Sequence, residues 1–497
     1  MNILIEAGPG CGKTTVLSDI YRYMKADDTK IWMENRPHLT QEQRTIYEFV
    51  RERFPEECKK KAAYIAYNVP IKEELEKKIH KDAEARTSHG WGYQVLNKRY
   101  GYLKINSNRM ANIIESHTGK LMKDMNFKDR AVWFAVGRYM DKLKSELLDP
   151  TLENLELLHS KYDDLVSYIP TSQIVQRILE IVPRVKTIDK AIGIDYIDQV
   201  WLALFALKEP IYEFGLVDEC QDLDPARLLL AQRMCKNLVF VGDPNQAINA
   251  WNGADAEAFT KIRTICDAEF PLKESFRCPP NICNYINGVK PNAKVRPSPG
   301  KEPGVVLRVD LDEFITMLNK TDASEYKKYL VMCRYNAPMI GVCLALIKAG
   351  IPAYILGEQL ITSLCYLVKN RKAATLDELE DKLDSYYEGI AANAEEWVAD
   401  IIRDKVDCIR AVIPNCKNVE DVEVQLKKFL KPSKGTDFIT MSTIHRAKGL
   451  EAEVAVVLYP PVEHPKAKKP LQIEQEKNLH FVAASRTKRD LIWVTRE

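Results

Sequence analysis

The feature that most constrains the fold of this chain is a glycine-rich loop directly after a short apolar run at residues 3–5. The loop ends in Lys-Thr-Thr and leads into an amphipathic stretch, which is the strand–loop–helix form of a phosphate-binding P-loop. Glycines let successive backbone N–H groups point at an anion, and the positive end of the next helix adds to the attraction. The residues predicted to form the phosphate cradle are Ala7, Gly8, Pro9, Gly10, Cys11, Gly12, Lys13, Thr14 and Thr15.

Two residues of this loop are predicted to contact a bound nucleotide directly. Lys13 can reach the β- and γ-phosphates, and the Thr14 hydroxyl can ligate Mg²⁺. The strict P-loop pattern begins with glycine, and Ala7 holds that place here. A relaxed match of this kind also arises by chance, but the apolar run before it and the amphipathic stretch after it favour nucleotide binding.

Length and composition narrow the class of protein. At 497 residues the chain exceeds one compact core, so two to four domains are expected. A content of 46% apolar and 29% charged residues is typical of a soluble globular protein. The net charge of +2 gives no global basic signal, so a contact with nucleic acid would need a local groove.

Cysteine usage and hydropathy indicate the compartment. The twelve cysteines form no Cys-x-x-Cys pair, which favours a reducing compartment over a disulfide framework or a zinc site. The sequence has no run of about eighteen apolar residues, and Met1 leads directly into an apolar run. We therefore expect no secretory signal, no cleavable targeting segment and no membrane contact. The expected location is the cytoplasm, which for a prokaryotic source would be that of a bacterial or phage-infected host cell.

Short apolar runs recur along the chain between helical patterns. Several are apolar throughout, as strands buried on both faces of a parallel sheet should be. The alternation predicts an α/β fold, and the two groups of runs predict two α/β domains. The predicted strands are residues 3–5, 63–67, 214–217 and 238–241 in the first domain, and 330–333, 438–442, 455–458 and 491–494 in the second.

Two charged, helical segments interrupt this alternation, and each is predicted to be an insertion in one α/β domain. Two stretches rich in proline and lysine are predicted to be loops. The predicted boundaries are 1–93 and 191–271 for the first domain, 94–190 for its insertion, 272–365 and 434–497 for the second domain, 366–433 for its shorter insertion, and 291–303 and 459–470 for the loops.

Acidic and amide side chains follow two of the predicted strands. Asp218 at a strand tip can hold Mg²⁺, and Glu219 can take a proton from an attacking water molecule. An adjacent Asp-Glu pair alone is usually solvated surface, but a pair that ends a strand in a chain with a P-loop predicts phosphoryl transfer. Gln246, in the polar loop after the strand at 238–241, is placed to sense a γ-phosphate.

Further motifs follow in an order that resembles superfamily 1 DNA helicases of the UvrD/Rep/PcrA type. The resemblance covers both α/β domains and adds to the P-loop and to the segments at 214–222 and 238–253. Its other motifs are Tyr67-Asn-Val-Pro-Ile-Lys-Glu-Glu-Leu75, Thr87-Ser-His-Gly-Trp-Gly92, Leu272-Lys-Glu-Ser-Phe-Arg-Cys-Pro279, Met441-Ser-Thr-Ile-His-Arg-Ala-Lys-Gly-Leu-Glu451 and Gln475-Glu-Lys-Asn-Leu-His-Phe-Val-Ala-Ala-Ser-Arg-Thr-Lys488.

The resemblance implies two RecA-like domains with ATP and Mg²⁺ bound in the cleft between them. Phe276 would stack on adenine, and Gly449 and Glu451 would belong to the nucleotide site, with Glu451 on the ribose. Arg277 and Arg486 would reach the γ-phosphate, where an arginine stabilises transition-state charge. Without the motif context, a surface ion pair would be the better interpretation of any single arginine.

The resemblance also implies a site for single-stranded and tailed duplex DNA. Trp251 would stack on a base, although core packing is the plainer interpretation of a lone tryptophan. For His89 and His445, a capping or core role is an equal alternative to a contact with DNA. The implied movement along the strand is 3′ to 5′, with unwinding of the duplex. The residues expected to hold phosphate or sugar are Asn68, Thr87, His89, Thr443 and His445.

The chain departs from the family pattern in two places. Members usually carry an adenine-reading glutamine before the P-loop, whereas only six residues precede Ala7 here. A similar string at 39–47 follows the P-loop, and its plainer interpretation is a helix start with Thr40 and Gln43 as a capping box. Nucleotide selectivity therefore stays open. The second insertion, which regulates duplex unwinding in the family, is short here. The resemblance therefore supports translocation more strongly than strand separation.

Two other functions fit the same motifs. The first is an ATP-gated nucleic-acid clamp, or a remodelling factor that displaces proteins with little strand separation. The second is action on RNA, because contacts to phosphate alone do not distinguish the 2′-hydroxyl. The pathway, whether repair or replication, is not indicated by any residue pattern.

Overall fold

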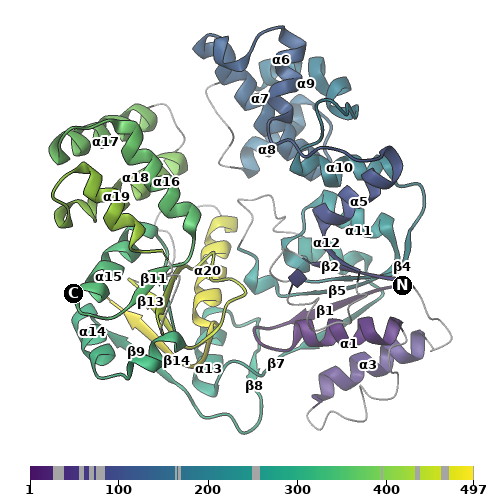
Figure 1. The fold of residues 1–497 in the computed structure, drawn as a ribbon. Helices are drawn as coiled ribbons and strands as arrows, with labels where there is room; N and C mark the ends of the chain where they lie inside the picture. The colour runs from purple at the N-terminus through teal and green to yellow at the C-terminus, as the bar shows by residue number, and fades with distance from the viewer. Residues whose placement is uncertain are drawn as a thin grey trace. The chain divides into compact units, whose positions relative to one another are not determined.

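The computed structural model describes residues 1–25, 39–54, 61–66, 72–73, 84–162, 165, 169–248, 258–392, 396–430, 437–459 and 470–495. The chain divides into two compact units, Met1–Lys273 and Glu274–Glu497. Figure 1 shows the helices and strands of both units.

The first unit is built on a six-stranded sheet in which every neighbouring pair is parallel. The predicted strands of this domain are confirmed over the described residues. Two more strands, β3 and β6, escaped prediction because β3 is short and β6 alternates half-buried and exposed residues before its buried last residue. In the order β3-β2-β4-β5-β1-β6, the strands are Ala85–Thr87, Ala62–Ala66, Tyr212–Val217, Cys235–Gly242, Asn2–Ala7 and Ala268–Leu272.

Side chains of β1 alternate between two cores on opposite faces of this sheet. Ile3 and Ile5 belong to one core, which holds the buried residues of α1 and α3, whereas Leu4 belongs to the other. The predicted capping box is confirmed, because Thr40 Oγ1 accepts the Gln43 N–H (3.1 Å) and Gln43 Oε1 accepts the Thr40 N–H (3.1 Å). The helices beside the sheet are α1 (Lys13–Lys25), α3 (Gln41–Arg53), α5 (Ser88–Tyr100), α10 (Tyr196–Ala206), α11 (Pro225–Met234) and α12 (Ala258–Ile265).

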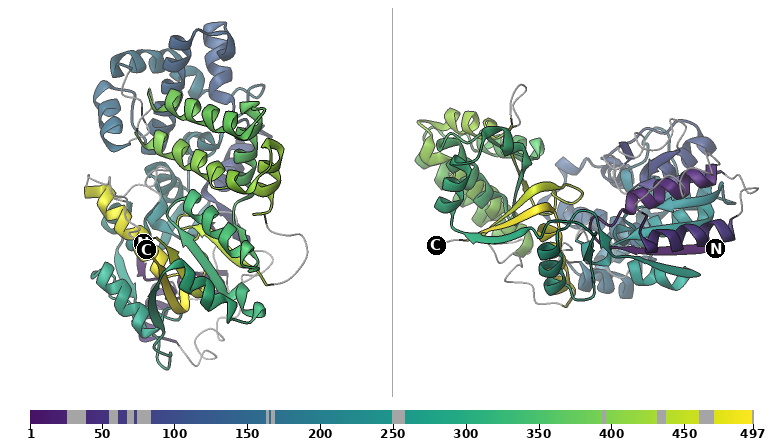
Figure 2. Two further views of the ribbon diagram at one scale, coloured as in Figure 1. Left: turned by 90° about the vertical axis from the view of Figure 1, so that its left-hand side faces the viewer. Right: turned by 90° about the horizontal axis from the view of Figure 1, so that it is seen from below.

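A group of helices lies on the far side of α5 and α10 from the sheet (Figures 1 and 2). It coincides with most of the predicted insertion at 94–190, and α5 itself continues to Tyr100. One isolated parallel bridge joins Ile105 to Ile194, where the chain enters and leaves the group. The exact insertion boundaries stay a prediction. The helices are α6 (Arg109–Thr118), η1 (Met122–Asp124), α7 (Phe127–Glu146), α8 (Leu152–Lys161) and α9 (Thr171–Lys186).

The second unit contains another six-stranded, all-parallel sheet. Its predicted strands are confirmed. The edge strands β9 and β11 escaped prediction, because β9 is largely exposed and β11 has three residues. In the order β11-β12-β10-β13-β14-β9, the strands are Ala353–Ile355, Ile439–Thr443, Tyr329–Cys333, Ala452–Leu458, Thr487–Val494 and Val305–Val309.

The segment predicted to be a loop at 291–303 contains a short strand. β8 (Arg296–Pro297) pairs with β7 (Glu274–Ser275) in a separate two-stranded sheet. Of the second predicted loop, residues 460–469 lie outside the described residues, and α20 begins at Pro470. The helices beside the large sheet are α13 (Pro280–Val289), α14 (Leu311–Asn319), η5 (Ala323–Lys328), α15 (Asn336–Lys348) and α20 (Pro470–Ala484).

The segment predicted as the second insertion is helical and shares one hydrophobic core with the sheet. That core includes Leu364, Leu383 and Ile409 of these helices together with Val331 and Met441 of the strands. Asp404 of α18 also caps α15, accepting the Ala337 N–H at 2.9 Å. The helices are α16 (Glu358–Arg371), α17 (Leu376–Ala391), α18 (Glu396–Arg410), η6 (Ile413–Asn415) and α19 (Val419–Lys427).

Candidate nucleotide and nucleic-acid site

The predicted P-loop lies between β1 and α1 in the first unit. Ala7 ends the strand, and Lys13 begins the helix. Gly10 and Gly12 have φ angles of 70° and 81°, which favour glycine. The Gly8 N–H donates to the Leu272 carbonyl of the neighbouring β6 (2.9 Å), so the start of the loop is bonded to the strand beside β1.

Charged side chains from neighbouring strands meet at the loop. β4, β5 and β1 are adjacent in the sheet, so their carboxyl ends lie at one edge. Lys13 Nζ is 3.3 Å from Glu219 Oε1, and the two side chains are 12% and 15% exposed. The structure therefore brings the P-loop lysine and the predicted proton acceptor together.

Asp218 lies deeper than its neighbour. Its Oδ1 accepts the Glu219 N–H (2.9 Å), and its Oδ2 accepts the Tyr64 hydroxyl (3.1 Å). Burial, followed by the Glu219 charge, raises the pKa of Asp218 to about 7, although Lys13 opposes the shift. A divalent cation beside this carboxylate would supply the missing positive charge. The environment of Asp218 thus fits the predicted Mg²⁺ ligand, with Thr14 on the first turn of α1 as the second.

Glu219 has backbone angles of φ 49° and ψ 46°, in the left-handed region that residues with a β-carbon rarely adopt. Such conformations persist where the surrounding structure enforces them, often at functional sites. Here the residue stands between the buried strand β4 and the 3₁₀ turn η2 (Cys220–Asp222).

Two residues of this site escaped prediction, Gln221 and Asp243. Gln221 Nε2 donates to the Glu219 carboxylate, and Gln221 Oε1 accepts the Asp243 N–H at 3.0 Å. Gln246 Nε2, in the turn η3 (Pro244–Gln246), donates to Asp243 Oδ2 at 2.6 Å. The chain Glu219–Gln221–Asp243–Gln246 therefore joins the ends of β4 and β5. The sequence carries both residues inside the two strand-end motifs, but their link depends on the strands being neighbours.

The second unit gathers predicted nucleotide-site residues around one carboxylate. Arg277 Nη2 lies 2.7 Å from Glu451 Oε2, and Lys488 Nζ lies 2.6 Å from Glu451 Oε1. Burial alone would raise the pKa of Glu451, but hydrogen bonds and charges from Lys488 and Arg277 hold it below the usual value. Glu451 is therefore ionised at neutral pH and fixed between two cations.

Arg486 is buried beside this cluster. Its guanidinium donates to the Val482 carbonyl (2.9 Å) and to Ser485 Oγ (3.0 Å). Arg277 donates to the Ser485 carbonyl at 3.4 Å, so Ser485 contacts both arginines. Phe276 is 41% exposed, and Gly449 lies in an exposed turn before β13. The roles of these residues toward a nucleotide stay predictions.

Two of the residues predicted to bind DNA lie at the start of α5. Thr87 is its N-cap, and its hydroxyl accepts the Gly90 N–H at 3.1 Å. The His89 ring lies 5.2 Å, centroid to centroid, from Tyr196, whose side chain is 65% exposed. Burial, then the Arg227 charge, lowers the pKa of His89 to about 4, so the ring is neutral at pH 7. Tyr196 was not predicted, because its contact depends on the packing of α10 against α5.

The other predicted DNA contacts belong to the second unit or lie outside the described residues. Thr443 ends β12, and its carbonyl accepts the Ala447 N–H at 2.9 Å. Burial, followed by the charges of Arg334 and Lys448, lowers the pKa of His445 to about 3. Asn68 and Trp251 lie outside the described residues.

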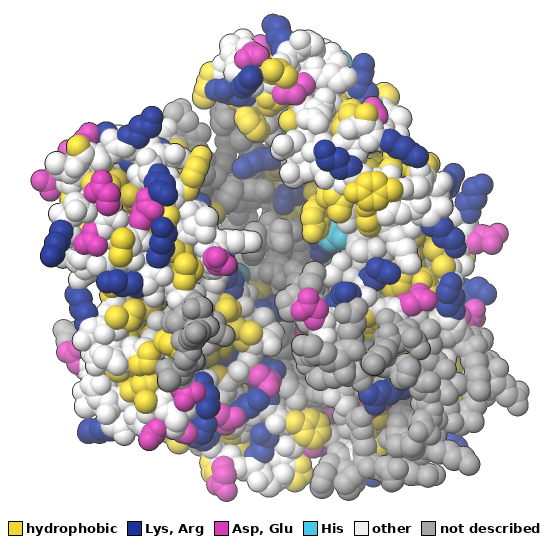
Figure 3. Space-filling view, in the orientation of Figure 1, with side chains coloured by type: hydrophobic (Ala, Val, Ile, Leu, Met, Phe, Trp, Pro, Cys, Tyr) yellow, Lys and Arg dark blue, Asp and Glu magenta, His cyan; other side chains and the backbone are white. Residues whose placement is uncertain are grey.

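The surface agrees with the small net charge. Among the described residues on the face shown in Figure 3, Lys and Arg side chains are interspersed with Asp and Glu and form no single large basic patch. No described helix is both long and apolar enough to cross a membrane.

A P-loop beside an acidic pair at the carboxyl edge of a parallel sheet defines the class of P-loop nucleoside triphosphatases. Comparison with known families then identifies the particular lineage. The UvrD/REP helicase N-terminal domain matches residues 1–266, and the UvrD-like helicase C-terminal domain matches residues 377–497. The chain belongs to the UvrD/REP helicase family, and its two parallel sheets agree with the RecA-like domains implied by the motifs.

Two characterised relatives share shorter segments. RecBCD enzyme subunit RecB of Escherichia coli (strain K12) is 32% identical over 81 residues, which cover 15% of this chain and 7% of RecB. ATP-dependent DNA helicase PcrA of Leuconostoc citreum is 28% identical over 171 residues, 29% of this chain and 22% of PcrA. The matched segments thus span less than a quarter of either relative.

Proposed function

We propose that this protein hydrolyses ATP to move 3′ to 5′ along single-stranded DNA and to unwind duplexes that carry a 3′ tail. The observation that supports hydrolysis most directly is the contact of Lys13 with Glu219. The Gln221 side chain joins Glu219 to Asp243 through hydrogen bonds. Family membership and the name of the PcrA relative support a DNA substrate.

The chemistry proposed for the first unit follows from competition for Lys13. An incoming phosphate competes with Glu219 for the lysine, because both are anions. Once displaced, the Glu219 carboxylate is free to accept the proton of the attacking water molecule, while Gln221 keeps it oriented. Asp218 and Thr14 would hold Mg²⁺, which neutralises phosphate charge. Gln246, hydrogen-bonded to Asp243, would detect the γ-phosphate.

The residues of the second unit are proposed to act on the same nucleotide. Arg277 would exchange its bond with Glu451 for the γ-phosphate, leaving Glu451 to accept a ribose hydroxyl. Arg486 would need to leave its present acceptors, which include the Val482 and Leu450 carbonyls and Ser485 Oγ, to reach a phosphate. Phe276 and Gly449 complete the proposed nucleotide site.

The proposed DNA surface consists of neutral groups rather than a basic patch. His89 and His445 are uncharged at pH 7, so each would donate a hydrogen bond from its ring N–H to a phosphate oxygen rather than form an ion pair. Tyr196 adds an exposed aromatic ring beside His89. Base stacking tolerates any sequence, which suits a motor that moves along DNA. The other proposed contacts are Asn68, Thr87, Trp251 and Thr443.

The test has two parts. ATP hydrolysis is measured with and without single-stranded DNA, and strand displacement is measured on duplexes with 3′ or 5′ tails. We expect stimulation by DNA and displacement from 3′ tails. Hydrolysis that ignores DNA would refute the proposal, and displacement from 5′ tails alone would refute the polarity. Matched RNA strands, titrated over a salt series, test the choice of nucleic acid.

A second candidate function is the displacement of bound proteins with little strand separation. It is favoured by the shared core of α16–α19 and the sheet, which makes the short second insertion part of its unit. Removal of a protein block from single-stranded DNA, without displacement of a strand from tailed duplex, would support this alternative.

A further inference from the structure

Close ion pairs among four charged side chains, three of them buried, join the helical group of the first unit to the start of α10. Lys144 of α7 lies 2.8 Å from Asp198 and 3.3 Å from Asp195. Arg109 of α6 lies 2.8 Å from the other oxygen of Asp198. Arg109, Lys144 and Asp198 are at most 1% exposed. None of these residues belongs to the nucleotide site or to the proposed DNA surface.

The two carboxylates also form the first turn of α10. Asp195 Oδ1 accepts the Asp198 N–H (2.8 Å), and Asp198 Oδ2 accepts the Asp195 N–H (3.1 Å), which completes a capping box. Carboxylates are favoured at a helix N-terminus. The two remaining oxygens, Asp195 Oδ2 and Asp198 Oδ1, both receive Lys144 of α7, and Arg109 of α6 pairs with the Asp198 Oδ2 that also accepts the Asp195 N–H. The position of this turn is therefore set by the helical group.

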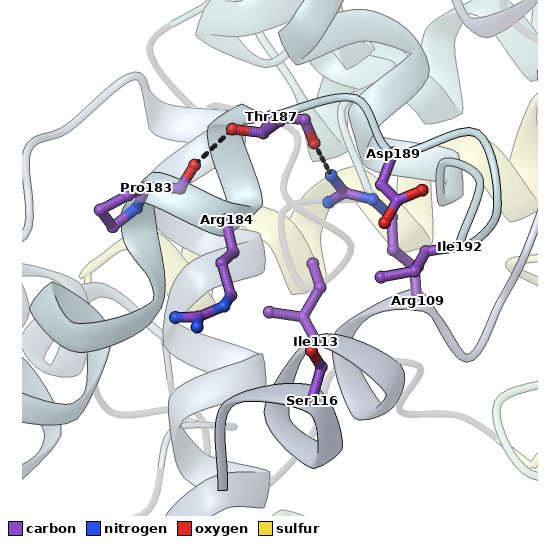
Figure 4. A pocket seen from close by; sticks show the side chains of 8 residues that line it. All are labelled: Arg109, Ile113, Ser116, Pro183, Arg184, Thr187, Asp189 and Ile192. Atoms are coloured by element: carbon purple, nitrogen blue, oxygen red, sulfur yellow. Dashed lines mark hydrogen bonds between the residues drawn. The ribbon is translucent and has the colours of Figure 1, made fainter. Parts of the chain in front are cut away.

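Arg109 ties further segments to the same point. Its Nε donates to the Gly193 carbonyl (2.9 Å), and its Nη2 donates to the carbonyls of Val185 and Thr187 (both 3.0 Å). Figure 4 shows the bond to Thr187, beside a pocket of about 380 Å³ between α6 and the end of α9. Arg109 therefore fixes the end of α9 and the segment that leads into α10.

From α10 the connection continues to the proposed DNA surface. A β-carbon on Gly92 of α5 would lie 1.9 Å from the Gln199 carbonyl of α10, so the two helix backbones are in direct contact. Tyr196, the first residue of α10, touches the His89 ring. Movement of the first turn of α10 would therefore displace both aromatic rings.

We infer that Lys144 and Arg109 are positioning residues for nucleic-acid binding. Through Asp198 and Asp195 they hold Tyr196 and His89 in place, and they contact no nucleic acid themselves. This inference rests on the proposed function, because it assumes that the start of α5 and Tyr196 bind single strands.

The test compares Lys144→Met with a matched control, Lys161→Met. Lys161 also belongs to the helical group and pairs with Glu146 of α7 (2.7 Å), but its pair does not involve α10. Lys144→Met keeps most of the side-chain volume, and Asp198 keeps Arg109 as a partner. Binding of a labelled single-stranded oligonucleotide is measured over a salt series, with basal ATP hydrolysis and circular dichroism on the same samples.

We expect Lys144→Met to raise the Kd for the oligonucleotide about tenfold, with an unchanged slope of log Kd against log salt, because no phosphate contact is lost. Basal hydrolysis should stay unchanged, and Lys161→Met should bind like the wild type. Equal binding by Lys144→Met and the wild type would overturn the inference alone. A wild-type protein that fails to bind the oligonucleotide would instead overturn the proposed function.

A second variant separates positioning from general destabilisation. Asp198→Asn keeps the shape of the side chain but places an amide against two cations. We expect it to weaken binding as Lys144→Met does, and the double variant to be no weaker than the worse single variant, because both changes break one link. Additive losses in the double variant would contradict the proposed link.

Discussion

The two sheets share their strand count and parallel direction but present opposite charges. In the first unit, Asp218, Glu219 and Asp243 surround a single lysine, Lys13. In the second unit, Arg277 and Lys488 surround a single carboxylate, Glu451. In both units, a group expected to bind a nucleotide is paired with a residue of its own unit. Under the proposed function, a nucleotide would compete with an internal partner at each sheet, and its binding would exchange ion pairs.

The largest effect is expected when a cation of the second unit, Arg277, is removed. Arg277→Ala should lower kcat for ATP hydrolysis by about 10³-fold or more, because a transition-state arginine is worth about that much. Nucleotide affinity should change far less. Arg489→Ala is the control, since Arg489 pairs with its neighbour Asp490 and is 51% exposed. Equal effects of the two substitutions would show that Arg277 is an ordinary surface cation.

The next largest effect is expected when a carboxylate of the first unit, Glu219, is neutralised. Glu219→Gln should lower kcat by about 10²- to 10⁴-fold, the range expected for a general base. Because Lys13 loses its partner, ATP should bind as tightly as before or more tightly. Lys13→Ala should instead weaken ATP binding. Stopped-flow binding of a fluorescent ATP analogue, alongside phosphate release, measures both quantities. Weaker binding by Glu219→Gln would contradict the exchange of partners.

A pH-dependent test concerns Asp218. Its pKa is about 7 in the folded protein and near 3.8 in the unfolded chain, so the folded state binds this proton more tightly. Its contribution to stability is fully present below pH 4 and is lost as the pH rises through 7. Asp218→Asn should therefore raise the free energy of unfolding of the metal-free protein at pH 8 by on the order of 4 kcal/mol. Urea titrations should show no gain at pH 4.

A smaller effect is expected for the link between β4 and β5. Gln221→Ala should lower kcat about tenfold, because Glu219 keeps its chemistry but loses the amide that orients it. Gln221→Glu should be worse, since it places a second carboxylate beside Glu219. Steady-state hydrolysis at saturating ATP and DNA checks both, and equal rates for the wild type and Gln221→Ala would rule out an orienting role.

The smallest expected effect concerns the base of the nucleotide. Gln43 lies next to Glu42, whose carboxylate accepts the Lys273 N–H at 2.7 Å, while the Gly8 N–H of the P-loop donates to Leu272. The start of α3 is thus close to the P-loop. If Gln43 reads adenine, Gln43→Ala should lower the preference for ATP over GTP several-fold. Competition binding measures this preference, and Phe276→Ala should weaken both nucleotides alike because stacking ignores the base edges.

The central strands could be predicted because burial on both faces leaves them uniformly apolar. Edge strands could not, since β6 and β9 carry exposed residues that interrupt the pattern. Lys13, Asp218 and Glu219, which the structure places together, could be selected from the sequence because each belongs to a motif continuous in sequence. The Gln221–Asp243 hydrogen bond and the Tyr196–His89 contact were missed, since each joins segments whose proximity depends on the sheet order or on helix packing.

The last strand of the first sheet is also where the chain leaves that unit. β6 ends at Leu272, whose carbonyl holds Gly8 of the phosphate loop. The next residue, Lys273, is held by Glu42 through its backbone amide and by Glu6 through its ammonium group. Because the first unit ends at Lys273, tension along the polypeptide would be borne by the same hydrogen bonds that anchor the loop. The affinity of the P-loop for a nucleotide would then depend on the mechanical load on the chain.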